Sequence, residues 1–300
     1  MVSLREYLKK LELYYAGTGI RLSFKSFVAL FFVIALVLTI VLLLLRLNAV
    51  TASAAFVAVM SLVIAIPVNA RNARITQIEE SLPDALKHMA LVLKAGGTTE
   101  AAVSEVSNAG YGPLSEELKT AFKKLREGKP FDEVFTETAK ITGSVLFQRT
   151  ALIVVDARRA GAGVADVMFE IAEDARDVSR IKRERYSRTT MHVIFLITSS
   201  LLLAPFIFGF AVSIVNYINQ GIAGALPQAP TRNLCDLNFL LVAFLVFQSI
   251  VTTIALGIIR EGKAIKYILY APLMVLGTLL VYEAGKWISF LIIGGKMLAC

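Results

Sequence analysis

The sequence contains few of the residues from which catalytic and metal sites are usually built. Its 300 residues include two histidines, two cysteines and one tryptophan, and only 18% are charged. Cys235 and Cys300 do not stand in a metal-ligand or redox spacing, and no GxxxxGK(S/T) phosphate loop occurs. We interpret His88 as a surface residue and His192 as an anchor at a membrane boundary. The sequence therefore predicts no enzyme, no cofactor and no bound metal.

Apolar residues are abundant instead, at 56% of the chain, where globular domains carry about 45–50%. A helix needs about 20 apolar residues to cross a bilayer, because each residue rises about 1.5 Å. The sequence predicts five such spans, at Phe27–Leu45, Ala49–Val68, Val193–Val215, Leu237–Ile259 and Tyr267–Ile293.

Two of these spans need comment. The first is too long for a signal peptide, lacks a clear small-residue cleavage site and is followed at once by the second. The fifth contains Glu283 and Lys286, and we interpret it as one long tilted helix with this charged pair on one face.

Lysine and arginine set the orientation, because basic loops stay on the cytoplasmic side. They are concentrated before the first span and between the fourth and fifth spans. This predicts a multi-pass protein of the cytoplasmic membrane with its N-terminus and residues 71–190 inside and its C-terminus outside. Cys235 and Cys300 would then lie outside, where either a disulfide or two free thiols is possible.

The segment 71–190 has little net charge, with 19 Lys and Arg against 18 Asp and Glu. A nucleic-acid-binding domain would carry a basic stripe, so nucleic acid is not expected as a partner. A basic cluster does precede the third span. Its function is either contact with membrane lipid or docking of an acidic partner. The cluster consists of Arg180, Lys182, Arg183, Arg185 and Arg188.

A local pattern repeats three times in this segment, around Gly96, Gly128 and Gly161. A base stands two residues before each glycine, apolar residues follow at six and seven, and a glutamate follows at nine. A helix that ends at a left-handed glycine and turns into a second helix explains the pattern. The repeat predicts three hairpins and hence a six-helix bundle. The repeated bases and glutamates either bridge each hairpin or are solvated; they are Lys94, Arg126, Arg159, Glu105, Glu137 and Glu170.

The last helix of the segment carries a heptad seam, which packs either on its own bundle or on another subunit. The seam consists of Val164, Met168, Ile171, Ala175 and Val178. No Gly or Pro occurs between Val164 and Ala204, so one helix is expected to continue into the third span.

The predicted fold class is therefore all-α, a polytopic membrane protein with about five spans and a cytoplasmic bundle. Its expected parts are an N-terminal cytoplasmic segment, a first pair of spans, the helical bundle, and three further spans with an external loop at 216–236. The corresponding ranges are 1–26, 27–70, 71–190 and 191–300.

Several short motifs, in their order and spacing, resemble the platform-protein family of type II secretion and type IV pilus machines. The family includes the secretion F protein, the Tad-pilus C protein and the archaellum J protein. The motif at Tyr111–Leu118 is most similar in sequence to the archaeal branch. The motifs are Leu82-Pro83-Asp84-Ala85-Leu86, Lys94-Ala95-Gly96, Tyr111-Gly112-Pro113-Leu114-Ser115-Glu116-Glu117-Leu118, Gly128-Lys129-Pro130-Phe131 and Ala160-Gly161.

The resemblance implies a platform that couples a cytoplasmic hexameric ATPase to the assembly of pilin-like subunits. It also implies a homodimer or a paired paralogue, because many members carry two such cytoplasmic domains and this chain has one. The residues we expect to dock the ATPase are Lys123, Lys124, Arg126, Arg158, Arg159, Glu105, Glu137 and Glu170.

Two other functions were weighed. A prepilin peptidase needs two membrane-edge aspartates, one in a GxGD motif, whereas Asp236 stands alone. A transporter, or a subunit of one, places broken helices and polar groups near mid-membrane, and here only Pro205, Gln248 and Pro272 are candidates. The transporter is therefore kept as the alternative to the platform.

Overall fold

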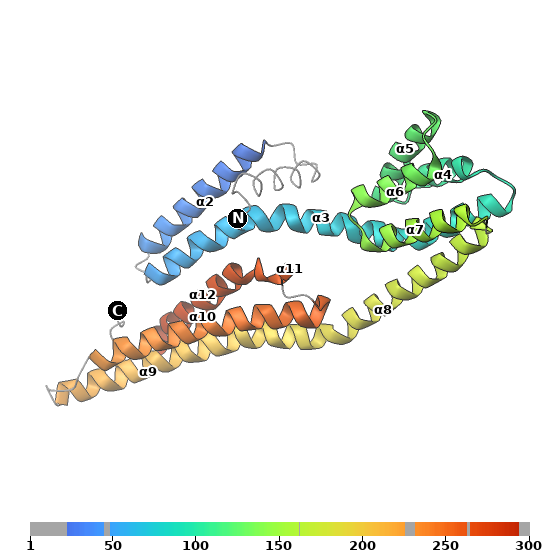
Figure 1. The fold of residues 1–300 in the computed structure, drawn as a ribbon. Coiled ribbons are helices and arrows are strands. Elements are labelled where there is room, and N and C mark those ends of the chain that lie inside the picture. The colour runs from blue at the N-terminus through green and yellow to red at the C-terminus, as the bar shows by residue number, and fades with distance from the viewer. Residues whose placement is uncertain (1–22, 45–48, 162, 226–231, 263–264, 294–300) are drawn as a thin grey trace. The chain divides into compact units, whose positions relative to one another are not determined.

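The computed structural model describes residues 23–44, 49–161, 163–225, 232–262 and 265–293, and all regular structure in these ranges is helical. The all-α prediction is confirmed for this part of the chain (Figure 1). The helices are α2 (Phe24–Leu44), α3 (Ala49–Lys94), α4 (Thr99–Asn108), α5 (Pro113–Arg126), α6 (Phe131–Thr142), α7 (Val145–Arg159), α8 (Val164–Thr198), the π-helix η1 (Ser199–Leu203), α9 (Ala204–Ala225), α10 (Arg232–Glu261), α11 (Ile265–Ile268) and α12 (Ala271–Ile293).

Five helices within the described ranges are long and apolar enough to cross a membrane, as predicted. The predicted start of the fifth at Tyr267 is wrong, because Tyr267 lies in the short α11 and the long helix begins at Ala271. Pro272 explains the break, since proline favours the first turn of a helix and disrupts a preceding one. The N-terminal segment up to residue 22 and the side chains of Cys235 and Cys300 lie outside the description.

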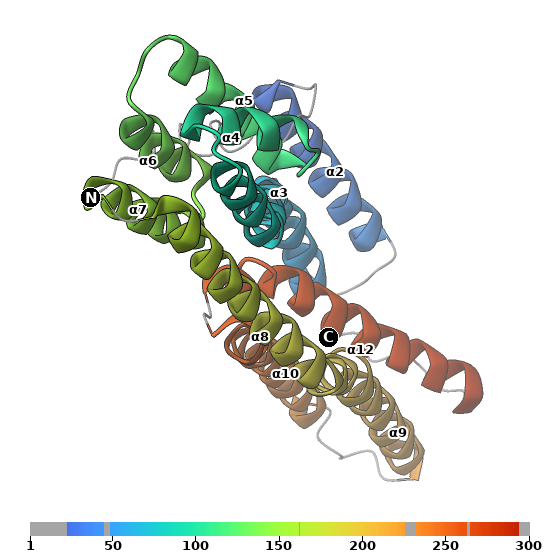
Figure 2. The ribbon, with the colours of Figure 1, turned by 90° about the vertical axis from the view of Figure 1, so that its right-hand side faces the viewer.

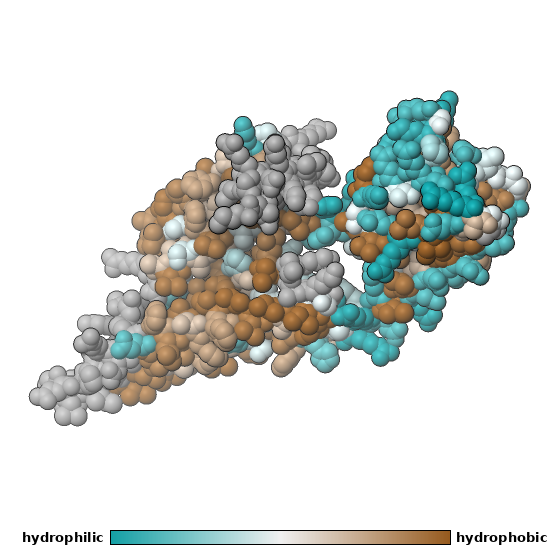
Figure 3. All heavy atoms as spheres, in the orientation of Figure 1, coloured by the Kyte–Doolittle hydropathy of each residue, from teal (hydrophilic) through white to brown (hydrophobic). Residues whose placement is uncertain are grey.

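The chain forms two compact units, residues 69–185 and the remainder. Helices α4 to α7, with the adjoining parts of α3 and α8, form the first unit, and α4 to α7 gather together in both views (Figures 1 and 2). The visible surface of this unit is mainly hydrophilic, whereas α9 and α10 present apolar side chains (Figure 3). This contrast is what a water-exposed unit and a lipid-exposed unit require.

A single apolar core holds the unit of residues 69–185 together. Leu82, Leu86 and Met89 on α3 and Leu114 and Leu118 on α5 lie in it and are almost fully buried. Side chains cap the following helices, since Thr98 accepts a hydrogen bond from the Ala101 amide and Ser144 accepts one from the Phe147 amide. Such caps satisfy amides that have no partner within the helix.

The three repeated glycines adopt the predicted conformation. Gly96, Gly128 and Gly161 have φ angles of 87°, 86° and 71°, in the left-handed region that favours glycine. Each follows the end of a helix, and the apolar pairs beyond them point inward, with Ala102, Val103, Val134, Phe135 and Met168 all buried. The sequence repeat thus corresponds to a repeated helix–turn–helix arrangement.

Helix α3 runs for 46 residues without interruption, although Pro67 and Pro83 lie within it. The change of segment expected near Arg71 falls inside this one helix, close to the boundary between the two compact units. A proline removes one backbone donor and tends to kink a helix. Here the neighbouring residues Val63, Ala65, Ile78 and Leu82 are buried, and this packing keeps the chain helical on both sides.

The seam of α8 packs mainly on its own unit, which favours the first of the two interpretations. Met168 and Ala175 are buried, Val164 and Ile171 contact the core, and only Val178 is well exposed, at 41%. The predicted continuation is confirmed: α8 leads through η1 into α9 with no irregular residue between them. The π-helix was not anticipated.

Helices α9 and α12 approach each other closely at two glycines. A Cβ atom on Gly285 would lie 2.8 Å from the carbonyl oxygen of Phe206, and one on Gly209 would collide with the carbonyl oxygen of Tyr282. Small residues at such contacts let backbones pack together in a membrane, where hydrophobic burial contributes little to association. Gly209 and Gly285 therefore set the α9–α12 distance.

Replacement of Gly209 tests this contact. Gly209→Ala is expected to destabilise the full chain in detergent by about 1–3 kcal/mol, because the new methyl group meets rigid backbone. Gly277→Ala is the matched control, since its Cβ would meet only the end of the Leu201 side chain, at 2.6 Å. Thermal unfolding measured by circular dichroism should show a larger loss for Gly209→Ala; equal effects would contradict the assignment.

Candidate docking surface

Ion pairs bring the three repeated glycine turns to the same end of the unit. Lys94, before the Gly96 turn, pairs with Asp166, after the Gly161 turn, at 2.9 Å. Arg158 and Arg159, before the Gly161 turn, both reach Asp132, after the Gly128 turn, at 2.9 and 3.2 Å. We call this region, at the end of α3 and the start of α8, the glycine-turn end.

Asp132 accepts the ion pairs of both Arg158 and Arg159 at this end of the unit. Partial burial acts to raise the pKa of its carboxyl group, but hydrogen bonds and charge from Arg158 and Arg159 outweigh this effect and lower it. Arg158 also lies over the ring of Phe131, at 5.3 Å, and its charge helps to lower the pKa of Glu100. The main cause of the Glu100 shift is a backbone hydrogen bond at the start of α4.

The expected docking residues divide into two groups. Lys124 pairs with Glu137 at 2.8 Å, and Arg158 and Arg159 are held by Asp132, so these four side chains of the set stabilise the unit itself. Within the described residues, no ion pair involves Lys123, Arg126, Glu105 or Glu170, and all four are exposed. Only this second group is available to a partner without breaking an internal contact.

Within the described residues, no repeated base pairs with the repeated glutamate of its own hairpin. Lys94 and Arg159 pair with aspartates of other hairpins, and Glu137 pairs with Lys124 rather than Arg126. The interpretation as bridges is therefore wrong for the part of the chain that the structure describes. A shallow hollow runs along α6 beside these contacts, lined by Pro130, Asp132, Glu133, Thr136, Glu137, Lys140 and Arg159.

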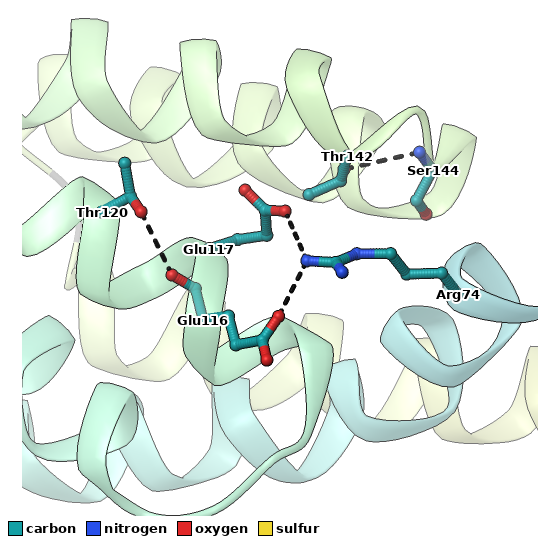
Figure 4. Close-up of polar contacts among 6 residues, drawn as sticks. All are labelled: Arg74, Glu116, Glu117, Thr120, Thr142 and Ser144. Carbon is teal, nitrogen blue, oxygen red and sulfur yellow. Dashed lines mark hydrogen bonds and ion pairs between the residues drawn. The ribbon is translucent and has the colours of Figure 1, made fainter. Parts of the chain in front are cut away.

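The opposite end of the unit is held by arginines of α3. The guanidinium of Arg74 bonds to Glu116 at 2.9 Å and to Glu117 at 3.1 Å, in the first turn of α5 (Figure 4). Arg71 lies over the α6–α7 turn, since a Cβ on Gly143 would be 3.0 Å from its guanidinium. These contacts give Glu116 and Glu117 a partner in addition to the favourable helix dipole.

Four ion pairs join α3 to α8 along an antiparallel ladder. Glu79 pairs with Lys182 at 2.7 Å, and Lys87 pairs with Glu173 at 3.3 Å. The other two pairs are Asp84–Arg176 and Lys94–Asp166. The acidic members lie on one half of α3 and the basic members on the other, and α8 has the complementary order. We call these four pairs the α3–α8 ladder.

A separate group of polar side chains lies among α9, α10 and α12. Lys286 bonds to Glu283 at 2.8 Å, and their side chains are only 14% and 9% exposed. The Tyr282 hydroxyl donates to Asn238 in α10, and the Ser213 hydroxyl of α9 lies 3.5 Å from the Lys286 carbonyl oxygen. The predicted pairing of Glu283 with Lys286 is confirmed, and buried ionisable groups of this kind are frequently functional in membrane proteins.

These arrangements can be compared with known proteins. Residues 85–211 match the family model of type II secretion system protein F. The matched region covers less than half of the chain and runs from α3 to α9. The resemblance predicted from the motifs is confirmed for this region.

One curated relative extends the similarity. An uncharacterised protein of Methanocaldococcus jannaschii is 24% identical over 200 residues, which cover 67% of this chain and 32% of the relative. The chain thus spans about a third of that protein's length. No solved structure matches the chain.

Sequence reasoning missed Asp132 and the α3 partners of α8. Asp132 has no distinctive neighbour in sequence, and its position at the start of α6 signals only a favourable helix dipole. The α3–α8 ladder could have been predicted from the sequence. Its acidic residues precede its basic residues on α3, and the same order on α8 makes the two helices complementary when they run antiparallel. Asn238 and Ser213 carry no comparable signal, since single polar residues are common in membrane helices.

Removal of the Asp132 carboxylate is expected to destabilise the unit near neutral pH by about 1 kcal/mol, the scale of partly exposed ion pairs. Because the folded-state pKa is lowered, the stabilisation is present above the unfolded pKa of about 3.9 and is lost as pH falls through the folded value. The unfolding midpoints of wild type and Asp132→Asn should therefore converge below about pH 4.

Thermal unfolding of the full chain in detergent between pH 3 and 7 provides the measurement. Glu133→Gln is the control, because this exposed neighbour has no described ion pair and should leave the midpoint nearly unchanged. A constant difference between wild type and Asp132→Asn across the whole pH range would contradict the role of the carboxylate.

Proposed function

We propose that the chain is a membrane platform protein of a type IV pilus-like or type II secretion-like machine, and not an enzyme. In this function it couples a cytoplasmic hexameric ATPase to the assembly of pilin-like subunits. The observation that carries the proposal is the family match over residues 85–211, which covers most of the water-exposed unit and continues into α9. The five apolar helices support a location in the cell membrane.

The proposed orientation places residues 69–185 and the N-terminus in the cytoplasm and the C-terminus outside. It rests on the distribution of basic residues, including the cluster at Arg180, Arg183, Arg185 and Arg188, which are exposed on α8. Arg260, at the end of α10, lies 4.1 Å from the ring centre of Tyr186 on α8. This contact holds the basic end of α10 against Tyr186 of α8, and anionic lipid headgroups would bind basic residues of this kind.

The ATPase is proposed to dock near the end of α5. Lys123 and Arg126 are exposed there and have no described internal partner, whereas the other basic candidates are held in ion pairs. Exposed charges at the edge of an interface increase the rate of association more than they increase the affinity. Glu105 and Glu170 supply exposed acidic groups on α4 and α8.

Charge reversal at Lys123 tests the docking face. Lys123→Glu, alone or with Arg126→Glu, is expected to weaken capture of the purified cognate ATPase about fivefold or more at low salt, because attraction becomes repulsion. Lys119→Glu is the matched control, since it changes the same charge on an exposed residue one turn earlier in α5. Binding would be measured by biolayer interferometry with the full chain in nanodiscs.

Equal losses for Lys119→Glu and Lys123→Glu would show a general charge effect and remove this face from the proposal. Failure of wild-type protein to capture any ATPase from native membranes would remove the platform function itself.

A second copy of this chain, or a paired paralogue, is proposed to bind on α7. Its exposed side presents Val145, Leu152 and Ile153, which are 60%, 52% and 51% exposed. Arg149 and Asp156 lie on the same face and have no described partner. They are placed symmetrically about Leu152 and Ile153, so a two-fold axis there would bring each Arg149 to Asp156 of the second copy.

The charge pattern makes this contact testable. Arg149→Asp and Asp156→Arg should each shift the protein in nanodiscs or detergent from dimer towards monomer, and the double substitution Arg149→Asp/Asp156→Arg should restore the dimer. Mass photometry supplies the measurement. If the double variant is as monomeric as the single variants, or if all remain dimeric, α7 is not the interface.

The transporter alternative draws support from one observation, the buried Glu283 and Lys286 beside Tyr282 and Asn238. Transport proteins use such groups along substrate pathways. Here Glu283 and Lys286 pair with each other within α12 and so neutralise each other's charge. Co-purification discriminates the two functions, because a platform retains an ATPase and a transporter does not require one.

A further inference from the structure

Helix α8 carries a second set of charges that is complementary to α3, one helical turn from the set that pairs with α3. The α3–α8 ladder pairs Glu79, Asp84, Lys87 and Lys94 with Lys182, Arg176, Glu173 and Asp166. Three or four residues further along α8 from these partners stand Arg185, Arg180, Asp177 and Glu170. Each has the same sign as the ladder residue that it follows.

We propose that α8 slides by one turn along α3 and exchanges the first set of four ion pairs for the second. In the second register Glu79 faces Arg185, Asp84 faces Arg180, Lys87 faces Asp177 and Lys94 faces Glu170. Three of the steps are four residues and one is three, close to the 3.6 residues of a helical turn, so the movement is about 6 Å of translation with little rotation. The proposal concerns residues 69–185 alone and does not depend on the proposed function.

Neighbouring registers are less complementary in charge. One turn in the reverse direction brings Lys87 towards Glu170 but Asp84 towards Glu173, and leaves Lys94 opposite Gly163. A second turn forward brings Asp84 towards Arg183 and Lys94 towards Glu173, but Lys87 towards Arg180, which is repulsive. Like charges in contact are destabilising and work against such registers. All four α3 charges of the ladder therefore meet opposite charges in two adjacent registers, and in neither of the registers beyond them are all four matched.

The packed face of α8 permits this movement. Small residues, Ala172, Ala175 and Ser179, follow Met168 along the inner side of the helix. Sliding α8 towards its own N-terminus places Ala172 where Met168 now lies and Ser179 where Ala175 now lies, so the inner side of the helix keeps small residues at both positions. Gly161 and Gly163, which precede α8, give the connecting turn freedom to adjust.

The described register remains the more stable of the two. Met168 is almost fully buried in it, and the ring of Phe169 lies 4.9 Å from the Lys87 ammonium and 5.0 Å from that of Lys94. The second register gives up both features. Core packing that is discrete in this way produces two distinct states rather than continuous deformation, as in other one-turn shifts between packed elements.

The experiment measures the register directly in the full chain, in nanodiscs and in a Cys235→Ser/Cys300→Ser background. The first pair of spin labels is placed at Leu91→Cys and Ile181→Cys, and the second pair at Gln77→Cys and Asp174→Cys. None of these four positions belongs to the ion pairs of either register. For the first pair the axial separation falls from about 18 Å to about 12 Å on sliding, and for the second it rises from about 14 Å to about 20 Å.

Reversal of the first set, Glu173→Lys/Arg176→Asp, makes the described register repulsive and leaves the second set intact. We expect the first label distance to shorten and the second to lengthen, each by about 5 Å. Reversal of the second set, Asp177→Lys/Arg180→Asp, should leave both distances at their wild-type values. Adding Asp84→Lys/Lys87→Asp to the first-set reversal restores the first register and opposes the second, and should return both distances to the wild-type values.

Opposite changes in the two label pairs distinguish sliding from separation of the helices, which lengthens both. Two lengthened distances, or unchanged distances in the first-set variant, would overturn the proposal. The proposal would also be overturned if Asp84→Lys/Lys87→Asp failed to return the label distances to their wild-type values. These substitutions restore the distances only if the distances depend on which charges pair.

Discussion

The antiparallel pairing of α3 with α8 is the interaction on which the water-exposed unit depends. The chain enters this unit along α3 and leaves it along α8, and the other helices of the unit lie between them in sequence. Leu82, Leu86 and Met89 of α3 and Met168 of α8 belong to the same core. A change in the register of the pair would therefore alter what the core contains as well as which charges meet.

The ladder contributes specificity more than stability. Its side chains are partly exposed, and exposed ion pairs each contribute about 0–1 kcal/mol. Burial of apolar side chains contributes more, at about 1.5–3 kcal/mol for each large one. Small residues such as Ala172 and Ala175 pack with little preference for register, so charge helps to discriminate among registers. The grouping of charges by sign excludes most registers, but cannot exclude the adjacent one because like charges recur after one turn of α8.

The features that sequence predicts well are those with a local physical cause. A left-handed turn favours glycine, so Gly96, Gly128 and Gly161 reveal their turns without knowledge of the rest of the fold. A bilayer likewise demands a long apolar helix. The partners of Asp132 and Lys94 were not predicted, because they lie on different hairpins and exposed charges leave no pattern that identifies a distant partner. The partner of Glu137 lies on its own hairpin but is Lys124, and not the expected Arg126.

The contact between α9 and α12 in the apolar unit tolerates less sliding of one helix along the other than the contact between α3 and α8 does. At Gly209 and Gly285, α9 and α12 meet through backbone atoms, and any sliding there would place larger side chains into a space with none to spare. The α8–α9 helix therefore joins a segment able to change register to one that is fixed. Between them lies η1, whose wider turns differ in residue count from an α-helix. Gly277 faces the flexible end of Leu201 at this point, and not backbone. A displacement of α8 would therefore change the geometry of η1 more than that of α9. The ion pairs of α8 with α3 can exchange, whereas the backbone contacts of α9 with α12 cannot.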